Sequence, residues 1–170
     1  MCNVNWEPTQ GPFAAKFMVD MLHVHRVAIV HDNTVYAKGL AEATRKALQS
    51  YRAVQVVFFD AITPGQKDFT SVPTRIKNDN PGVLYFTGYY AEGRLLAKQF
   101  KELQVPGTFM AGNANDEATF IKEAGSGADG VLITTAPLAR FLPHAGQFVV
   151  LRDARPVLMS ADIDSDGALT

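Results

Sequence analysis

A run of β-branched and apolar residues near the start of this chain stops at a polar turn and is followed by a helical pattern. Residues 27–30 are apolar without alternation, which is typical of a strand buried on both faces of a parallel sheet. The polar segment 31–36 comes next, and Leu40, Ala43, Ala47 and Leu48 then recur at helical spacing. The pattern predicts a strand that leads through a polar loop to the start of a helix, which is where open α/β sheets hold their ligands.

The same unit of short apolar strand, polar turn and amphipathic helix recurs along the chain. It predicts strands at Arg26–Val30, Val54–Asp60, Gly82–Phe86, Thr108–Met110 and Gly130–Thr134, and helices at Gly11–Leu22, Tyr36–Ser50, Ser71–Asn78, Glu92–Leu103 and Asp116–Ala124. Such alternation favours right-handed crossovers and a parallel sheet covered by helices on both faces. We therefore expect a three-layer α/β/α fold with the flavodoxin-like strand order, in which the first strand is internal.

The alternation breaks after Pro137. The remainder predicts a loop and then two short strands, Phe148–Leu151 and Val157–Met159, which suit an antiparallel ribbon at the edge of the parallel sheet. The sequence contains no internal repeat, low-complexity tract or linker, so residues 1–170 are expected to form one α/β unit.

Composition narrows the class of partner. A chain of 170 residues with 47% hydrophobic content suits one core, and its formal net charge of -1 argues against a nucleic-acid partner. No apolar run approaches the roughly 18 residues of a membrane span, so direct membrane insertion is not expected. The first residues lack the basic and apolar regions of a signal peptide, and the single Cys2 excludes an internal disulfide. Neither observation fixes the compartment, because a fragment of a longer exported precursor would share both.

Six segments of this chain resemble segments of one protein family and occur in the same order as in that family. They are Gln10–Phe17, Arg26–Asp32, Tyr36–Ala41, Phe58–Phe69, Tyr85–Glu92 and Ala128–Thr134. Together they are similar to the periplasmic Leu/Ile/Val-binding proteins of ABC importers, which have the type I periplasmic binding protein fold. That family is two-lobed, and the resemblance implies that residues 1–170 correspond to the second lobe alone. Residues 10–137 would form its α/β core, and residues 138–170 a loop, a returning strand segment and an acidic tail.

The resemblance carries over to three ligand-binding positions. Tyr36 matches the tyrosine after the first strand of the lobe, and Tyr89 matches the first tyrosine of the Gly-Tyr-Tyr turn. Asn113 falls where branched-chain amino-acid binders have a glutamate for the ligand's α-ammonium group. A neutral amide cannot make that charge-assisted contact, so the ligand is expected to differ from an ordinary aliphatic amino acid unless another acid supplies the charge. The candidates for that charge are Asp116, Glu117 and Glu7.

The resemblance implies a binding module and not an enzyme. The expected function is the substrate-binding lobe of an ABC importer receptor for a small, polar, amino-acid-like ligand, acting in the full-length protein with the importer's membrane subunits and without a cofactor. The full-length family member would be periplasmic or extracellular. Because a ligand clamped between two lobes gains contacts from both, the isolated lobe is expected to bind very weakly or not at all. Self-association as a homodimer, through the cleft face or the terminal strand, is a further expectation.

Other interpretations remain open at this point. The two tyrosines also suit partly buried rings with solvated hydroxyl groups. The turn at His31 and Asp32 would fit a flavodoxin-like enzyme or signalling domain that binds nucleotide, flavin or phosphoryl groups, although receiver domains want an acidic pair at this turn. For Asp32 and Asp60, turn formation and helix capping are the favoured interpretation. A ligand-sensing domain of a receptor is a third alternative.

Catalytic and metal sites find little support in the sequence. No serine lies in a nucleophile elbow, and the histidines 23, 25, 31 and 144 show no metal-binding spacing. The segment Asp162–Gly167 matches the first half of an EF-hand loop, whose closing glutamate would fall beyond Thr170, and no flanking helices are evident, so an acidic tail is favoured over a calcium site.

Overall fold

The computed structural model describes residues 7–135, 146–152 and 155–161, with the side chains of residues 10–135. Its helices are α1 (Glu7–Asp20), α2 (Val35–Leu48), α3 (Ser71–Asp79), α4 (Tyr90–Glu102) and α5 (Ala118–Ala124), with short 3₁₀ turns η1 (Asn113–Asn115) and η2 (Gly125–Ala128). Its strands are β1 (Arg26–His31), β2 (Gln55–Ala61), β3 (Val83–Phe86), β4 (Thr108–Ala111), β5 (Leu132–Thr135), β6 (Gly146–Arg152) and β7 (Arg155–Ala161).

These strands form a single sheet in the order β2-β1-β3-β4-β5-β6-β7. Strands β1 to β5 are parallel, and the flavodoxin-like order with β1 internal is confirmed. Strands β6 and β7 continue the sheet in antiparallel fashion, as the pattern after Pro137 predicted, with Leu132 of β5 opposite Val150. The free edge of β5 is therefore covered by β6, which prevents an unpaired parallel strand from being exposed.

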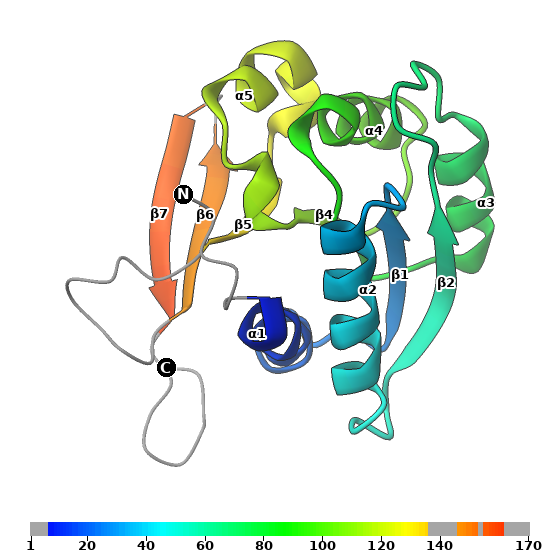
Figure 1. Cartoon of the computed structure of the whole chain (residues 1–170), viewed down its shortest axis with the longest axis vertical. Coiled ribbons are helices and arrows are strands. Elements are labelled where there is room, and N and C mark those ends of the chain that lie inside the picture. Colours follow the sequence, from blue (N-terminus) through cyan, green and yellow to red (C-terminus); the bar gives the residue numbers. More distant parts are fainter. Residues whose placement is uncertain (1–6, 136–145, 153–154, 162–170) are drawn as a thin grey trace.

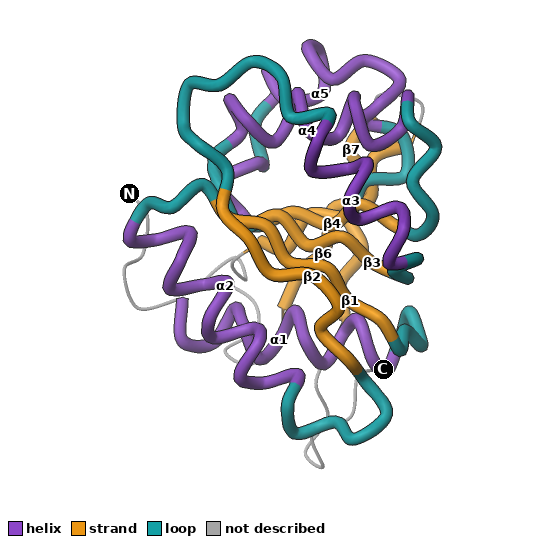
Figure 2. The backbone as a smooth tube through the Cα atoms, turned by 90° about the vertical axis from the view of Figure 1, so that its right-hand side faces the viewer, coloured by secondary structure: helices purple, strands orange, loops and turns teal. Residues whose placement is uncertain are grey.

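Helices cover the parallel sheet on both faces. Helices α1 and α2 lie on one side, and α3, α4 and α5 lie on the other (Figures 1 and 2). Side chains that alternate along the strands divide accordingly. In β1, Val27 and Ile29 belong to the core beneath α1 and α2, whereas Ala28 and Val30 belong to the core beneath α3, α4 and α5. Burial on both faces explains why these strands are continuously apolar.

Helix α1 packs closely on α2 at a glycine. A Cβ atom at Gly11 would lie 2.8 Å from the Cβ atom of Ala43 and 2.9 Å from the backbone nitrogen of Thr44. Real Cβ contacts are not this short, so only glycine permits this helix separation.

Two helix starts differ from the sequence prediction: α1 begins at Glu7, before the predicted Gly11, and α5 begins at Ala118, after the predicted Asp116. Pro12, predicted for the first turn of α1, lies inside that helix. The difference at α5 lies next to the candidate site. The predicted helix began at Asp116, but the structure has the η1 turn at Asn113–Asn115 and an extended Glu117, with φ -133° and ψ 134°, before the helix begins at Ala118. This irregular stretch directly follows β4, at the edge of the sheet where the predicted ligand-binding residues lie.

Among the described helices, none is long and apolar enough to cross a membrane.

Candidate functional site at the carboxyl edge of the sheet

Tyr36 is held in the first turn of α2. Strand β1 ends at His31, and Thr34 caps the helix by accepting a hydrogen bond at its side-chain oxygen from the Ala37 amide, at 3.3 Å. The intervening Asn33 has a φ of 65°, a left-handed conformation that asparagine tolerates better than most residues. This sharp turn places the Tyr36 side chain at the carboxyl edge of the sheet.

Asn113 approaches Tyr36 from the segment that follows β4, which is the second strand from β1 in the sheet. It follows β4 as the first residue of η1, and its side-chain oxygen accepts a hydrogen bond from the Tyr36 hydroxyl group. The approach is close: a Cβ atom at Gly112 would lie 3.6 Å from the Tyr36 hydroxyl oxygen and 3.2 Å from a methyl carbon of Leu40. The structure thus joins two residues that are 77 positions apart in the sequence.

Tyr89 completes the group from the loop between β3 and α4. Its ring centroid lies 5.7 Å from that of Tyr36, with an interplanar angle of 48°. The Tyr89 residue is 43% exposed, so part of its ring is open to a partner. We call Tyr36, Tyr89 and Asn113 the carboxyl-edge cluster. Exposed ring surface beside an amide and a hydroxyl group suits a small molecule with both apolar and polar parts.

A series of buried polar side chains links the Tyr36 hydroxyl group to the interior of the protein. The Gln10 side-chain oxygen lies 3.5 Å from that hydroxyl, and the Gln10 side-chain nitrogen donates to the Thr134 hydroxyl oxygen at 2.9 Å. The Tyr85 hydroxyl lies 3.3 Å from the same Thr134 oxygen, and burial raises the pKa of Tyr85 far above its ordinary value. Sequence reasoning missed Gln10, because nothing in a single helical glutamine marks it as buried.

Asp32 and Asn115 are the other residues whose roles the sequence did not fully reveal. Asp32 is 1% exposed, and one of its carboxylate oxygens accepts from the Thr34 amide at 3.0 Å and the Thr34 hydroxyl at 2.7 Å. Turn formation was the favoured interpretation of Asp32 and is correct. The second carboxylate oxygen, however, accepts from the Tyr89 amide at 3.0 Å, a contact across 57 residues. The Asn115 side chain donates to the backbone oxygens of Gly88 at 2.8 Å and Gly112 at 3.2 Å.

The phosphoryl and nucleotide alternative depends on His31 and Asp32, and neither side chain is accessible. Both Asp32 oxygens are engaged by protein donors, and His31 is buried. Burial lowers the pKa of His31, although the neighbouring Asp32 carboxylate acts in the opposite direction. The His31 Nδ1 atom accepts from the Asn33 amide at 3.1 Å, which requires the unprotonated form of that nitrogen. Asp60 at the end of β2 pairs with Arg75 at 3.0 Å.

Among the acids considered as partners for a ligand ammonium group, Asp116 and Glu117 are exposed. The pKa of Asp116 is raised, first by partial desolvation and second by the adjacent Glu117 carboxylate. The side chain of Glu7, residues 136–145 and the acidic segment Asp162–Gly167 lie outside the described residues. Within the described part of the chain, no three His, Cys, Asp or Glu side chains are grouped so as to hold a metal ion.

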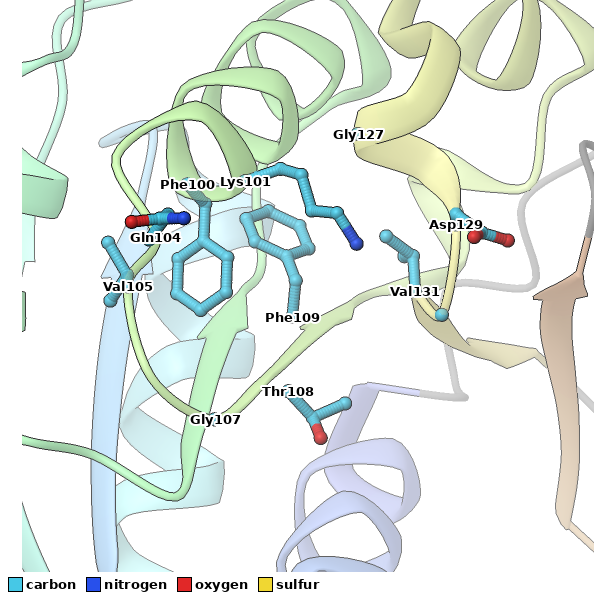
Figure 3. Close-up of a pocket in the computed structure, with 11 residues that line it drawn as sticks. Phe100, Lys101, Gln104, Val105, Gly107, Thr108, Phe109, Gly127, Asp129 and Val131 are labelled. Carbon is cyan, nitrogen blue, oxygen red and sulfur yellow. The ribbon is translucent and has the colours of Figure 1, made fainter.

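A pocket of about 440 Å³ lies at the opposite edge of the sheet, and Figure 3 shows its lining. It is bounded by the end of α4, the start of β4 and the segment before β5, and the Lys101 side chain extends across it toward Val131 (Figure 3). Its aromatic wall consists of Phe100 and Phe109, which are buried and pack edge to face, 5.6 Å apart. The pocket lies at the amino ends of the parallel strands, whereas ligands of open α/β sheets bind at the carboxyl ends. The carboxyl-edge cluster is therefore the stronger candidate.

Comparison with known proteins points to one family. The model of the periplasmic binding protein family matches residues 1–150. The Leu/Ile/Val-binding protein BraC3 of Rhizobium johnstonii is 40% identical over 136 residues, and the Leu/Ile/Val-binding protein of Escherichia coli is 37% identical over 125 residues. These alignments cover 80% and 74% of this chain but only 37% and 34% of the two relatives. The crystal structure of a leucine-binding protein LivK from Thermotoga maritima superposes with a TM-score of 0.72 at 27% identity, over 81% of this chain and 40% of that one.

Proposed function

Because this chain belongs to the periplasmic binding protein family, whose members bind substrates for transport and are not enzymes, we propose that the carboxyl-edge cluster is one half of a binding site for a small, amino-acid-like molecule. The observation that supports the proposal is the convergence of Tyr36, Tyr89 and Asn113 from three separate loops. The relatives are named for binding leucine, isoleucine and valine, which contain both an apolar side chain and charged ends.

Each member of the cluster would make a different contact. The partly exposed Tyr89 ring would cover an apolar part of the ligand, and Tyr36 and Asn113 would meet a polar part. Since the Asn113 oxygen accepts the Tyr36 proton, its amide nitrogen is left to donate toward a carbonyl, carboxylate or hydroxyl oxygen. The cluster itself carries no negative charge, which favours a ligand recognised through its hydrogen-bond acceptors over one recognised only through an ammonium group.

The proposed site is incomplete without the rest of a bilobed protein. The chain spans between 34% and 40% of the length of the three relatives described above, and the exposed Tyr89 ring is the kind of surface that an opposing lobe would cover. We infer that residues 1–170 act as a single lobe. The full-length protein would deliver its ligand to the membrane subunits of an ABC importer, outside the cytoplasm. A ligand touched on one side only gains part of the available contacts, so affinity of the isolated chain should be very weak.

The test is an amide NMR titration with leucine, isoleucine and valine, carried to millimolar concentrations. Shifts confined to residues near Tyr89 and Asn113 are expected, together with no saturable heat in calorimetry at micromolar concentration. Tyr89→Ala should abolish the shifts, whereas Tyr90→Ala, at the neighbouring partly exposed tyrosine, should leave them. Shifts at another surface, or micromolar binding by a demonstrated monomer, would contradict the proposal.

The variant Asn113→Glu distinguishes a ligand bound through an α-ammonium group from a ligand bound through its acceptor oxygens. If the ligand presents an α-ammonium group, Asn113→Glu should raise affinity, since a charge-assisted hydrogen bond is roughly twice as strong as a neutral one. If the ligand is bound through its acceptor oxygens, the same change should weaken binding, because the amide donor is lost.

The isolated chain also offers an apolar surface for self-association. Val35 is 93% exposed and lies at the start of α2, and Tyr90 is exposed at the start of α4, on the same edge as Tyr89. We propose a weak homodimer through this edge. Sedimentation velocity should show concentration-dependent association that Val35→Asp reduces, and a strict monomer at high concentration would refute it.

A further inference from the structure

The loops that carry Tyr36, Tyr89 and Asn113 are connected by two buried side chains. We propose that Asp32 and Asn115 are positioning residues, which fix the Gly88–Tyr89 peptide and thereby preset the carboxyl-edge cluster before any ligand binds. The inference rests on the proposed function in one respect only, namely that the cluster contacts a ligand.

The Gly88–Tyr89 peptide is held at both of its polar ends. The Tyr89 N–H donates to a carboxylate oxygen of Asp32 at 3.0 Å, and the Gly88 carbonyl accepts from the side chain of Asn115 at 2.8 Å. These two groups belong to one planar peptide unit, so holding both fixes the orientation of its plane. The peptide follows β3, and Asp32 and Asn115 follow the strands on either side, β1 and β4. Tyr89 is thus fixed from both neighbouring strands.

Each positioning side chain has a second contact that reaches another loop of the cluster. The other oxygen of Asp32 accepts from the amide and hydroxyl groups of Thr34, the residue that caps the helix bearing Tyr36. Asn115 also donates to the Gly112 carbonyl at 3.2 Å, next to Asn113. Two side chains therefore link all three loops.

Burial makes these links rigid. Asp32 is 1% exposed and Asn115 is fully buried, so water cannot replace the lost hydrogen bonds if either loop moves. A carboxylate also suits this place, because Asp32 lies against the amino ends of α2 and α4, where helix dipoles favour negative charge.

Two glycines make room for the positioning side chains. A Cβ atom at Gly88 would lie 2.8 Å from the Asp32 carboxylate and 2.4 Å from the Phe86 ring, and one at Gly93 would lie 2.0 Å from the Asn115 side-chain oxygen. That Asn115 oxygen has no hydrogen-bond partner among the described residues, so its amide is oriented by its donor side alone. A tightly enclosed amide with one productive orientation is suited to fixing a loop and not to binding a ligand directly.

The test is amide hydrogen exchange on the whole 170-residue chain without ligand. The protection of the Tyr89 amide is compared with that of the central strand β3, represented by Leu84. In the wild type, Tyr89 should be protected even though its ring is exposed. Asp32→Asn and Asn115→Asp are isosteric and should each speed exchange at Tyr89 by roughly tenfold or more relative to Leu84, as expected for loss of a buried hydrogen bond. A purely structural role would speed both amides in proportion.

The control is Asp60→Asn, which changes an exposed carboxylate at the end of the neighbouring strand β2. It should leave the ratio of Tyr89 to Leu84 exchange rates unchanged. An unprotected Tyr89 amide in the wild type, or an unchanged ratio in both isosteric variants, would overturn the proposal. If a variant does not fold, nuclear Overhauser contacts between the Tyr36 and Tyr89 rings in the wild type decide the matter, because a preset cluster requires them without ligand.

The two proposals fail in different ways. A protected Tyr89 amide with no shifts on addition of leucine, isoleucine or valine would refute binding of these three amino acids at the cluster but leave the positioning roles intact. Ligand shifts at an unprotected Tyr89 would support the binding site and refute preorganisation.

Discussion

Gly11 and Gly39 give a sharp test of the fold, because the same substitution should have opposite effects at the two sites. Both are helical glycines, in α1 and α2, and neither has a left-handed backbone. A Cβ atom at Gly39 would meet nothing within 4 Å, whereas one at Gly11 would lie 2.9 Å from the backbone nitrogen of Thr44. Alanine should therefore stabilise the protein at position 39 and destabilise it at position 11.

The magnitudes follow from two competing terms. Replacing a helix-interior glycine by alanine favours the folded state by about 0.5–1 kcal/mol, which is the whole effect expected for Gly39→Ala. At Gly11 the same gain is opposed by overpacking, which costs roughly 1–3 kcal/mol. The atoms that obstruct the new methyl group are mainly backbone, so they cannot rotate away. The two variants should differ in free energy of unfolding by about 2 kcal/mol, and in melting temperature by about 2–4 °C for each kcal/mol in a protein of this size.

Urea denaturation followed by circular dichroism measures both variants under one condition. The double variant Gly11→Ala with Ala43→Gly supplies a further check, because it removes the Cβ contact at 2.8 Å but leaves the Thr44 nitrogen at 2.9 Å. Ala43→Gly alone should cost about 0.5–1 kcal/mol in α2, so the double variant should be less destabilised than the sum of the two single variants. A Gly11→Ala protein as stable as the wild type would show that α1 and α2 do not pack as described.

Three further predictions concern buried polar groups. Burial lowers the pKa of His31, so the unfolded chain binds the proton more readily and the free energy of unfolding should fall as the pH drops below about 6.5. In urea denaturation at several pH values, His31→Asn should reduce this dependence on pH. An unchanged pH dependence would contradict the burial of the imidazole. Burial raises the pKa of Tyr85, so Tyr85→Phe should leave the tyrosinate absorbance of the folded protein unchanged in an alkaline titration, whereas a smaller signal before unfolding would refute it. The buried Glu92 carboxylate accepts from the Gly65 amide at 2.9 Å, so Glu92→Ala should raise hydrogen exchange at Gly65 several-fold, and equal protection in both proteins would show that this loop contact is absent.

The sequence by itself determined the α/β class, the five parallel strands and the antiparallel ribbon that follows them. These features depend on local signals: continuous apolar runs for strands buried on both faces, helical spacing for the crossovers, and prolines and glycines between them. The start of α5 was missed because Asn113–Asn115 and Glu117 adopt a conformation set by their neighbours in the sheet edge, and no local propensity marks it.

The resemblance to a family placed Tyr36, Tyr89 and Asn113 on three loops, but their ligand contacts remain a prediction. Only the tertiary structure decided that they meet, and that Asp32 and Asn115 link their loops from within the protein. The physical reason is that hydrogen bonds across 57 or 77 residues depend on strand order and on side-chain direction at the sheet edge. A lone aspartate or asparagine after a strand has the same local pattern whether its side chain faces water or closes a buried network.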